Sequence, residues 1–557
     1  MKKTCTHCSA GFEITPDDLV FYDKVSPEFG GKKYAIPPPT MCPSCRRQQR
    51  LMFRNFFRLY HRECDLTGKK IISMYDKDVP FPVYEMHEWW DDAWDAESYS
   101  SEVHPSESFL LQVERLHRTV PRMSIVNSQC ENTDYCNFSL ASRNCYLVFG
   151  SVSNEDCSYG HIVWQSHDCF DCLYCYRCEF CYECIDCVQC HTINFSRDCD
   201  GCSDSMFLVH CNGCRSCFGC VGLKNKEYHI FNEAHTKEEY EQKIADLNIG
   251  SRETVEMAKL RVRELTGSEI VKTYHGFGCE NVVGDYLYNC KNIVEGFDLK
   301  NCEDCSYSAT LESFADSQDC NFSPAKSELC YNSITVHGHT LLCCHSCLNG
   351  SSNLSYCDNC YACQDCFGCA GLKNKRYCIL NKQYTKEEYV KIVTQLTERM
   401  KVSGEWGEFF PHSFSPFAYN ETIACEYFPL NEKEVGGRGW QWKMPTEENH
   451  KYMGPVAEIP NDIQKVDDDI CEKILRCSTT NRLYKITSQE LAFYRQMNLP
   501  VPTKCFDQRH KERMALRNPR KLWGRQCAKC SKEIQTTYAP ERPEIVYCES
   551  CYLQTVY

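Results

Sequence analysis

Hydrophobic and polar residues in the central part of the chain alternate with a period of three. The segment CFDCLYCYRCEFCYECIDCVQC, residues 169–190, has a cysteine at every third position eight times in succession. Eighteen cysteines from Cys130 to Cys220 share this register, and nearly all positions between them in the same register are small or apolar. An α-helix repeats every 3.6 residues and a strand every two, so neither element explains the period.

A second period of twelve residues accompanies the first. Cysteines recur at this spacing at positions 175, 187, 199 and 211. Asn144, Asp156 and Asp168 each precede a cysteine at the same spacing, and such side chains favour turns because they hydrogen-bond the nearby backbone. A fixed repeat with small inward residues is typical of a solenoid. We therefore expect a narrow β-solenoid with about twelve residues per coil.

Stacked coils of this kind predict columns of equivalent side chains. Cys169, Cys181 and Ile193 should stack in one interior column. The residues expected to form an outward aromatic ladder are Tyr146, Phe170 and Tyr182. Three roles are open for the inward thiols: a small apolar filler of a thin core, a zinc ligand shared between coils, or a disulfide partner.

A second, less regular solenoid is expected after the first. Two segments of the first array recur in the second, FGCVGLKNKEY (218–228) as FGCAGLKNKRY (367–377) and NEDCSY (154–159) as CEDCSY (302–307). Each array ends in TKEEY, which begins at Thr236 and at Thr385 and is a capping-box start to a helix. Helices at these points would cover sheet edges that otherwise invite aggregation.

The cysteine content suggests a reducing compartment. The 557 residues include 46 cysteines, and the N-terminal residues lack the apolar segment of a signal peptide. No stretch approaches the 18 apolar residues that a membrane span needs. We therefore expect a soluble, cytoplasmic protein without a membrane partner, in which clustered cysteines hold metal.

Paired CxxC motifs at both ends predict two structural zinc sites. Four thiolates in tetrahedral reach bind Zn²⁺ and leave no open position for hydrolytic chemistry. The predicted ligands are Cys5, Cys8, Cys42 and Cys45 in the first site and Cys527, Cys530, Cys548 and Cys551 in the second.

The two termini repeat each other. FEITPDDLVFY (12–22) aligns with YKITSQELAFY (484–494), and residues 42–64 align without gaps with residues 505–527. Each end is therefore a double module with two successive sites, of which one is degenerate. The degenerate sites contain Cys64, Thr67, Glu85 and Glu88 at one end and Cys477, Thr480, Cys505 and Gln508 at the other.

The predicted fold is mainly β, with two narrow cysteine-lined β-solenoids in tandem, helical caps and zinc-ribbon-like or treble-clef-like modules at both termini. The predicted segments are the N-terminal module (1–95), a linker (96–123), the first solenoid (124–234), a helical connector (235–272), the second solenoid (273–384), a capping helix (385–401), an irregular aromatic linker (402–470) and the C-terminal module (471–557).

Two short basic segments stand in an acidic chain. The net charge is −14, yet residues 46–63 hold six arginines against one glutamate, and residues 509–526 hold seven Lys or Arg against one glutamate. Spacing by four puts their basic residues on one side of a helix, where guanidinium groups suit phosphate. The candidate RNA- or DNA-binding residues are Arg46, Arg50, Arg54, Arg58, Arg509, Arg513, Arg517 and Lys521. An acidic protein partner or the acidic remainder of the chain itself are the alternatives.

Several motifs carry a resemblance over nearly the whole chain. They are CPSCRRQQRLMFRN, RECDLTGKKIISMY, FGCVGLKNKEY, GEWGEFFP, AYNETIACEYFPL and RNPRKLWGRQCAKCSKEIQTTYAPERPEIVYCESCY. With these motifs the chain resembles a family of uncharacterised cysteine-rich zinc-ribbon proteins common in bacteria of the candidate phyla radiation. The resemblance implies zinc ribbons and a cytoplasmic origin, and it brings no established activity.

No known catalytic motif is present. The sequence lacks a glycine-rich phosphate loop, a GxSxG motif and an HExxH motif. We predict a non-catalytic zinc-binding scaffold or interaction protein without catalytic residues. The alternative is a thiol-rich metal-storage or redox protein that uses the solenoid cysteines.

Overall fold

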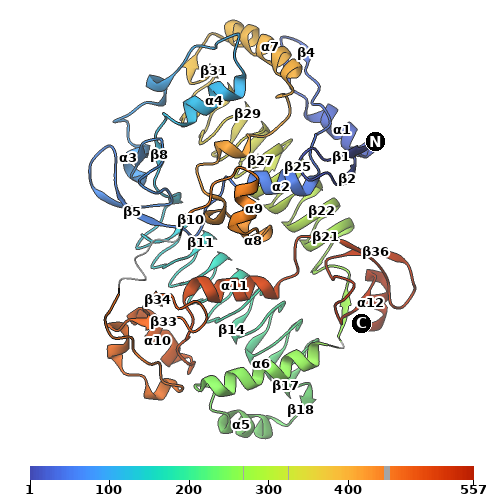
Figure 1. Ribbon diagram of the computed structural model, residues 1–557. Helices are drawn as coiled ribbons and strands as arrows, with labels where there is room; N and C mark the ends of the chain where they lie inside the picture. Colours follow the sequence, from blue (N-terminus) through green and yellow to red (C-terminus); the bar gives the residue numbers. More distant parts are fainter. Residues whose placement is uncertain (268, 324, 445–451, 557) are drawn as a thin grey trace.

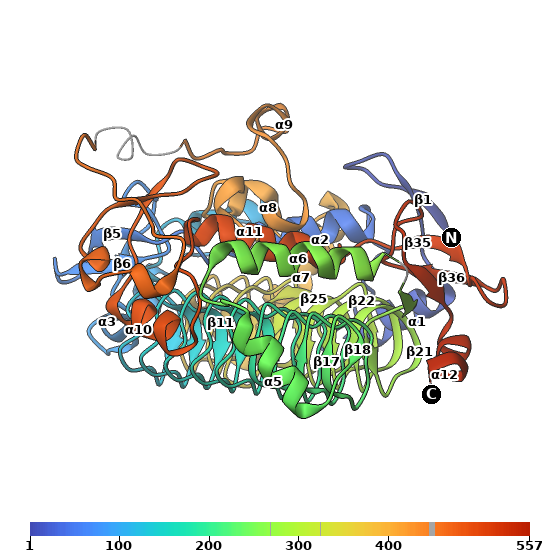
Figure 2. The same ribbon diagram turned by 90° about the horizontal axis from the view of Figure 1, so that it is seen from below.

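Two β-solenoids lie side by side and run in opposite directions (Figure 1). The chain is described by a computed structural model that covers residues 1–267, 269–323, 325–444 and 452–556. Small parts of the predicted connector, second solenoid and aromatic linker, at 268, 324 and 445–451, lie outside the described residues. Helices α2 (Pro43–Leu51), α6 (Arg252–Thr266) and α11 (Phe506–Leu516) lie over one face of the coils (Figure 2).

A left-handed residue at every third position explains the period of three. From Phe138 to Phe231, each third residue has a φ angle between 48° and 69°. Each triplet thus turns one corner, and four corners complete a coil of twelve residues. Asn and Asp tolerate this conformation better than other non-glycine residues, which explains why Asp171 and Asp186 stand at such corners. The residue after each corner points inward, and in the densest coils it is cysteine.

The first solenoid has the predicted parallel register. His161 pairs with Leu173 and Val163 with Cys175, a shift of twelve residues in each case. Its strands are β9 (Asn127–Ser128), β10 (Asn137–Leu140), β11 (Phe149–Val152), β12 (His161–Trp164), β13 (Leu173–Tyr176), β14 (His191–Asn194), β15 (Ser203–Met206), β16 (Arg215–Phe218), β17 (Glu227–Ile230) and β18 (Glu233–Ala234).

The predicted interior column is confirmed. Cys169, Cys181 and Ile193 are buried in one cluster. The aromatic ladder points out of the coil, as predicted, yet it does not face solvent. Phe170 stacks on Phe493 of the C-terminal module with ring centroids 4.0 Å apart, so the ladder is a docking surface within the molecule.

The interior thiols lie in the thin core of the coils, where most cysteines of the first solenoid form one buried cluster. All 46 cysteines lie among the described residues, and none forms a disulfide in this structure. Each interior thiol can donate a weak hydrogen bond to a backbone carbonyl, as Cys172 does to Phe170 at 3.4 Å. In the described part of the chain, no three solenoid cysteines bring their sulfurs within 4.8 Å of one another.

The second solenoid is less regular because its coil length changes. Cys320 pairs with Ser333 thirteen residues later, and Tyr331 pairs with Leu342 eleven residues later. These coils shift the cysteines out of the earlier register. The strands are β20 (Gly276–Phe277), β21 (Glu280–Tyr288), β22 (Lys291–Lys300), β23 (Glu303–Ser306), β24 (Ala309–Glu312), β25 (Phe314–Ser323), β26 (Ser327–Glu328), β27 (Tyr331–Ile334), β28 (Gly338–Leu342), β29 (Ser351–Ser355), β30 (Gln364–Phe367), β31 (Cys378–Ile379) and β32 (Lys382–Gln383).

Helices follow each solenoid at the predicted capping boxes. Thr236 starts α5 (Lys237–Asp246) and Thr385 starts α7 (Lys386–Ser403), each with its hydroxyl accepting from the backbone N–H three residues on. The segments between modules and solenoids contain α4 (Phe109–His117), α8 (Ala424–Tyr427) and α9 (Glu432–Gly437). No helix in the described ranges has both the length and the apolar character to cross a membrane.

The two terminal modules have matching elements. The N-terminal elements besides α2 are β1 (Lys2–Thr4), β2 (Gly11–Glu13), α1 (Pro16–Val25), β3 (Glu28–Phe29), β4 (Lys32–Lys33), β5 (Tyr60–Glu63), β6 (Lys70–Ser73), β7 (Val83–Tyr84), α3 (Met86–Trp90) and β8 (Arg122–Met123). The C-terminal elements besides α11 are β33 (Leu475–Arg476), β34 (Leu483–Tyr484), α10 (Ser488–Gln496), β35 (Trp523–Gln526), β36 (Glu533–Thr536), β37 (Ile545–Tyr547) and α12 (Glu549–Val556), with β19 (Ile270–Lys272) pairing β37.

Candidate metal centres and arginine clamps

Both predicted sets of four cysteines converge. Within each set the four sulfur atoms lie within 4.8 Å of one another. The Cys8 and Cys42 sulfurs are 3.7 Å apart, and the Cys530 and Cys548 sulfurs are 3.8 Å apart. A tetrahedral site with Zn–S bonds of about 2.3 Å places its sulfurs about 3.8 Å apart. Both clusters can therefore hold a metal ion of this size.

Local hydrogen bonds favour the thiolate form of some cysteines in each cluster. The N–H groups of Cys8 and Cys42 donate to the Cys5 sulfur at 3.5 and 3.3 Å. A hydrogen bond with the Cys45 thiol lowers the pKa of Cys42 to about 5. Burial raises the pKa of Cys527, but backbone N–H donors, Cys548 first, outweigh it and lower that pKa to about 6. Thiolate is the form that binds metal.

In the two degenerate sites, residues at the aligned ligand positions make other hydrogen bonds. Glu85 accepts from the backbone N–H groups of His87 and Glu88 and so caps α3. Gln508 donates to Glu512 at 2.8 Å. Among the described residues, neither set of aligned positions forms a group that could hold a metal ion.

The predicted Arg-rich outer faces are wrong for six of the eight basic residues. The buried residues are Arg46, Arg50, Arg54, Arg509, Arg513 and Arg517, each at most 8% exposed. Arg58 and Lys521 are exposed. The spacing does put Arg46 and Arg50 on one side of α2, and Arg509 and Arg513 on one side of α11, but that side faces a solenoid. The predicted helices end earlier than expected, so the other four basic residues lie beyond them. The guanidinium groups of the six buried arginines are therefore not available to a phosphate backbone in this structure.

The two modules dock crosswise through one repeated set of contacts. In α2, Arg46 and Arg50 pair with Asp319 of the second solenoid at 2.7 and 3.1 Å. In α11, Arg509 and Arg513 pair with Asp171 of the first solenoid at 3.0 and 2.8 Å. Both carboxylates are fully buried. We call each such set an arginine clamp.

Each clamp also includes a solenoid tyrosine, whose hydroxyl donates to the acidic residue of a helix capping box. Asp18, which closes the capping box of α1, accepts from the Tyr307 hydroxyl at 3.1 Å. Glu490, which closes that of α10, accepts from the Tyr159 hydroxyl at 2.5 Å. Tyr159 and Tyr307 are 148 residues apart, as are Asp171 and Asp319. The two halves of the molecule therefore repeat the whole docking arrangement.

One arginine of each module sits between the two solenoids. Arg54 lies over Phe138 of the first solenoid at 3.3 Å and over Phe322 of the second at 5.7 Å. Its counterpart in the C-terminal module, Arg517, lies over Tyr174 and Tyr286 at 3.9 and 4.1 Å. Such cation–π contacts gain strength where water is excluded. These two arginines therefore bind the solenoids to each other.

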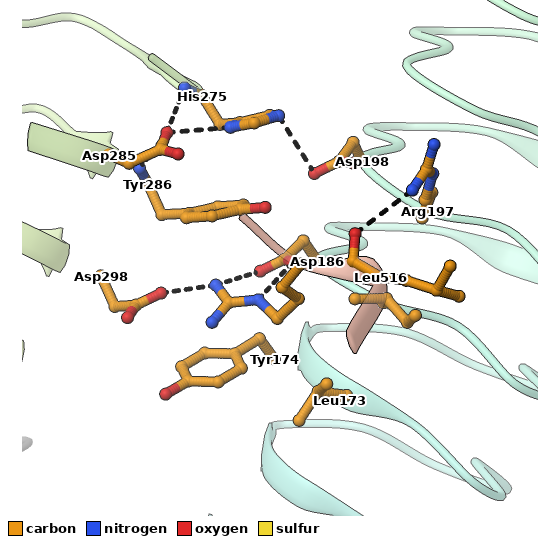
Figure 3. A network of polar contacts seen from close by, with 12 residues as sticks. Leu173, Tyr174, Asp186, Arg197, Asp198, His275, Asp285, Tyr286, Asp298 and Leu516 are labelled. Carbon is orange, nitrogen blue, oxygen red and sulfur yellow. Dashed lines mark hydrogen bonds and ion pairs between the residues drawn. The ribbon is translucent and has the colours of Figure 1, made fainter. Parts of the chain in front are cut away.

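The counterpart, Arg517, also joins two carboxylates. It pairs with Asp186 of the first solenoid at 2.6 Å and with Asp298 of the second at 2.5 Å, and Figure 3 shows Asp186 and Asp298 reaching the same guanidinium from opposite sides. Burial raises the pKa of Asp298, but Arg517 and Arg520 outweigh it and hold that pKa below its usual value. At an effective dielectric constant of 20, two unit charges about 4 Å apart attract by roughly 4 kcal/mol.

A second bridge between the solenoids uses histidines. His275 lies between Asp285 at 2.8 Å and Asp198 at 3.9 Å (Figure 3), and His210 lies between Glu269 at 2.8 Å and Asp198 at 3.3 Å. Burial opposes charging, but hydrogen bonds to Asp198 and Glu269 outweigh it and raise the pKa of His210 to about 10. The pKa of His275 is also raised.

These histidines predict a loss of stability in alkaline solution. The folded-state pKa of His210 exceeds the unfolded value of about 6.5, so its contribution is complete below pH 6.5 and is lost as the pH rises to about 10. We expect the urea midpoint to fall across this range, with a smaller fall for His210→Gln. An equal fall in both proteins would show that other groups cause it.

The acidic partners of the arginines were not predicted from the sequence. Asp171 and Asp186 stand at corners of the coil, where an Asp is expected as a turn former. Their side chains are nevertheless buried by a module more than 300 residues away. The one signal that could have singled out Asp171 is that Asp319 stands at the equivalent position of the second array.

Comparisons with known proteins give no family. No protein-family model and no curated protein matches the sequence. Among solved structures, the crystal structure of a "putative acetyltransferase" from Desulfovibrio desulfuricans G20 matches over 50% of this chain and 82% of that chain, with 11% sequence identity and a TM-score of 0.10. A likeness at that TM-score says nothing about the activity of this chain.

Proposed function

We propose that the protein is a non-catalytic, zinc-dependent scaffold. In this proposal the two four-cysteine clusters hold zinc and thereby fix the helices α2 and α11, whose arginines clamp the paired solenoids. The observation that carries the proposal is the burial of six arginines against carboxylates and aromatic rings of the solenoids. Zinc is favoured because four thiolates in tetrahedral reach are its usual structural ligands.

Metal and sulfide analysis of anaerobically purified protein tests this proposal. We expect two zinc ions bound by thiolate per chain and no acid-labile sulfide. Iron with acid-labile sulfide would contradict it and favour the alternative of a thiol-based redox protein. Metal bound by many more than eight thiolates would favour metal storage in the solenoids.

Binding to RNA, DNA or an acidic protein stays a separate prediction. Of the eight basic residues on which it rests, the exposed Arg58 and Lys521 are the two that could contact a partner without rearrangement. Phosphate contacts release counterions, so binding to nucleic acid would weaken steeply with salt. Replacing Arg58 and Lys521 with Glu should then abolish that binding and leave the zinc content unchanged.

A further inference from the structure

Two buried histidines and one half-buried glutamate lie together where the C-terminal module meets the first solenoid. His161 comes from β12, His510 from α11 and Glu426 from α8. One ligand atom from each lies within 4.8 Å of the other two. The His510 Nε2 and Glu426 Oε1 atoms are 3.1 Å apart. Donor atoms with bonds of about 2.0–2.1 Å to a tetrahedral metal would lie about 3.3 Å apart.

His161 lacks the hydrogen bonds that a buried histidine normally makes. Its side chain is 1% exposed, and neither ring nitrogen has a hydrogen-bond partner among the described residues. Glu426 also has one buried oxygen, Oε2, without a partner in the same residues. Buried polar atoms are nearly always satisfied, and those that are not call for an explanation such as an ion. A metal ion would satisfy His161 and Glu426 together.

The group formed by Asp198, His210 and His275 does not share this feature. The nitrogens of His210 are paired with Asp198 and Glu269, and those of His275 with Asp285 and the Tyr538 hydroxyl. The ring nitrogens of His210 and His275 therefore already have polar partners within the protein.

Aromatic packing encloses the two histidines. Phe57 packs against both histidines, with ring centroids 4.9 Å from His161 and 4.6 Å from His510, and shields them from water. Two nearby guanidinium groups, those of Arg517 and Arg520, both pair with the Asp298 carboxylate, so they do not oppose a bound metal with their full charge.

The equivalent place in the other half of the molecule has different residues. Arg47 aligns with His510, and Ala309 stands 148 residues after His161. Arg47 is buried there, with its guanidinium over the Phe297 ring at 4.8 Å. That half thus accommodates a permanent positive charge at the aligned helix position, whereas this half presents metal-ligand atoms from two histidines and a glutamate.

From this geometry we propose that His161, Glu426 and His510 bind one divalent transition-metal ion. Two imidazoles and one carboxylate suit zinc and iron(II), and three protein ligands leave at least one coordination position for water or another small ligand. The site is distinct from the two four-cysteine clusters because it contains no thiolate. The chain would then hold three metal ions in two chemical classes.

Anaerobic titration of the metal-free protein with Co²⁺ tests the site. We expect three equivalents to bind, two with intense thiolate-to-cobalt charge-transfer absorption and one with only weak ligand-field absorption. Glu426→Gln and His161→Asn should each lose the weak component and keep both thiolate sites. His210→Gln is the matched control, since that histidine is satisfied by carboxylates, and it should retain all three equivalents.

The outcomes separate this inference from the proposed function. Saturation of the wild-type protein at two equivalents, both with thiolate absorption, would overturn the third site and leave the zinc scaffold intact. A third equivalent that persists in both Glu426→Gln and His161→Asn would also overturn it. If the wild-type protein shows the weak component but no thiolate absorption, the assignment of the four-cysteine clusters is wrong and the third site stands. Because the wild-type stoichiometry decides by itself, a variant that fails to fold does not spoil the test.

Discussion

Replacing Cys530 with Ser is expected to release one zinc ion and to unfold the C-terminal module from residue 527 onward. Structural zinc contributes on the order of 10 kcal/mol to the folding of isolated zinc-finger peptides at neutral pH, and this small module has only a short apolar core, formed with β19, besides the cluster. Cys530 is exposed, so the loss cannot come from a cavity in the core. Zinc content by mass spectrometry and protease sensitivity of this segment measure the effect.

The same substitution elsewhere provides the control. Cys130 is half-buried at the start of the first solenoid and belongs to neither cluster. Cys130→Ser should retain both thiolate-bound zinc ions and normal protease resistance. Unchanged zinc content in Cys530→Ser would mean that this residue is not a ligand.

Replacing Arg517 with Met is expected to destabilise the paired solenoids by roughly 3–5 kcal/mol, because removing one partner leaves buried charge without compensation. Arg517 is the shared partner of Asp186 and Asp298, whose side chains are 5% and 4% exposed. Methionine keeps most of the apolar contact with Tyr174 and Tyr286 but removes the charge. Urea unfolding at neutral pH measures the difference.

Two further variants show whether the charge is the cause. Arg58 makes an exposed ion pair with Asp507, and Arg58→Met should cost about 0–1 kcal/mol. Adding Asp186→Asn to Arg517→Met should recover part of the lost stability, since Asp298 keeps Arg520 as its partner and Asp186 no longer leaves an unpaired buried charge. If Arg517→Met is no more harmful than Arg58→Met, the clamp does not hold the solenoids together.

The solenoid coils and the thiolate clusters could be predicted because local chemistry determines them. A left-handed residue at every third position has a direct signature in the triplet of Asx, aromatic and small residues, and Asp171 illustrates it. The four ligands of each cluster likewise follow from two CxxC turns, each of which brings two thiols together within a few residues.

The docking of the modules could not be predicted in the same way. The spacing of Arg509 and Arg513 shows that they share one side of a helix, but it does not show which surface covers that side. Their partner, Asp171, is 338 residues from Arg509 and has the local pattern of a turn former. The His161 site could not be predicted from the sequence either, because its three residues come from three distant elements and none belongs to a short motif.

Most basic residues of the two arginine-rich segments contact the solenoids and do not form the outer faces that we expected. An arginine-rich helix next to a zinc knuckle is typical of nucleic-acid binding, and an acidic remainder of the chain was the alternative. The acidic residues prove to be aspartates at equivalent corners of two solenoids, Asp171 and Asp319, each of which pairs with two arginines. The repeat of the modules and the repeat of the solenoids are thus complementary to each other.

Hydrogen exchange of the wild-type protein and of Cys8→Ser/Cys530→Ser, which lacks one exposed ligand in each cluster, tests the central claim most directly. If zinc fixes the modules that clamp the solenoids, the variant should lose amide protection in α2 and in α11. The cysteine-filled coils between Cys169 and Cys190 should stay protected, because their hydrogen bonds run from coil to coil. Full protection of α2 and α11 in the zinc-free variant would contradict the claim.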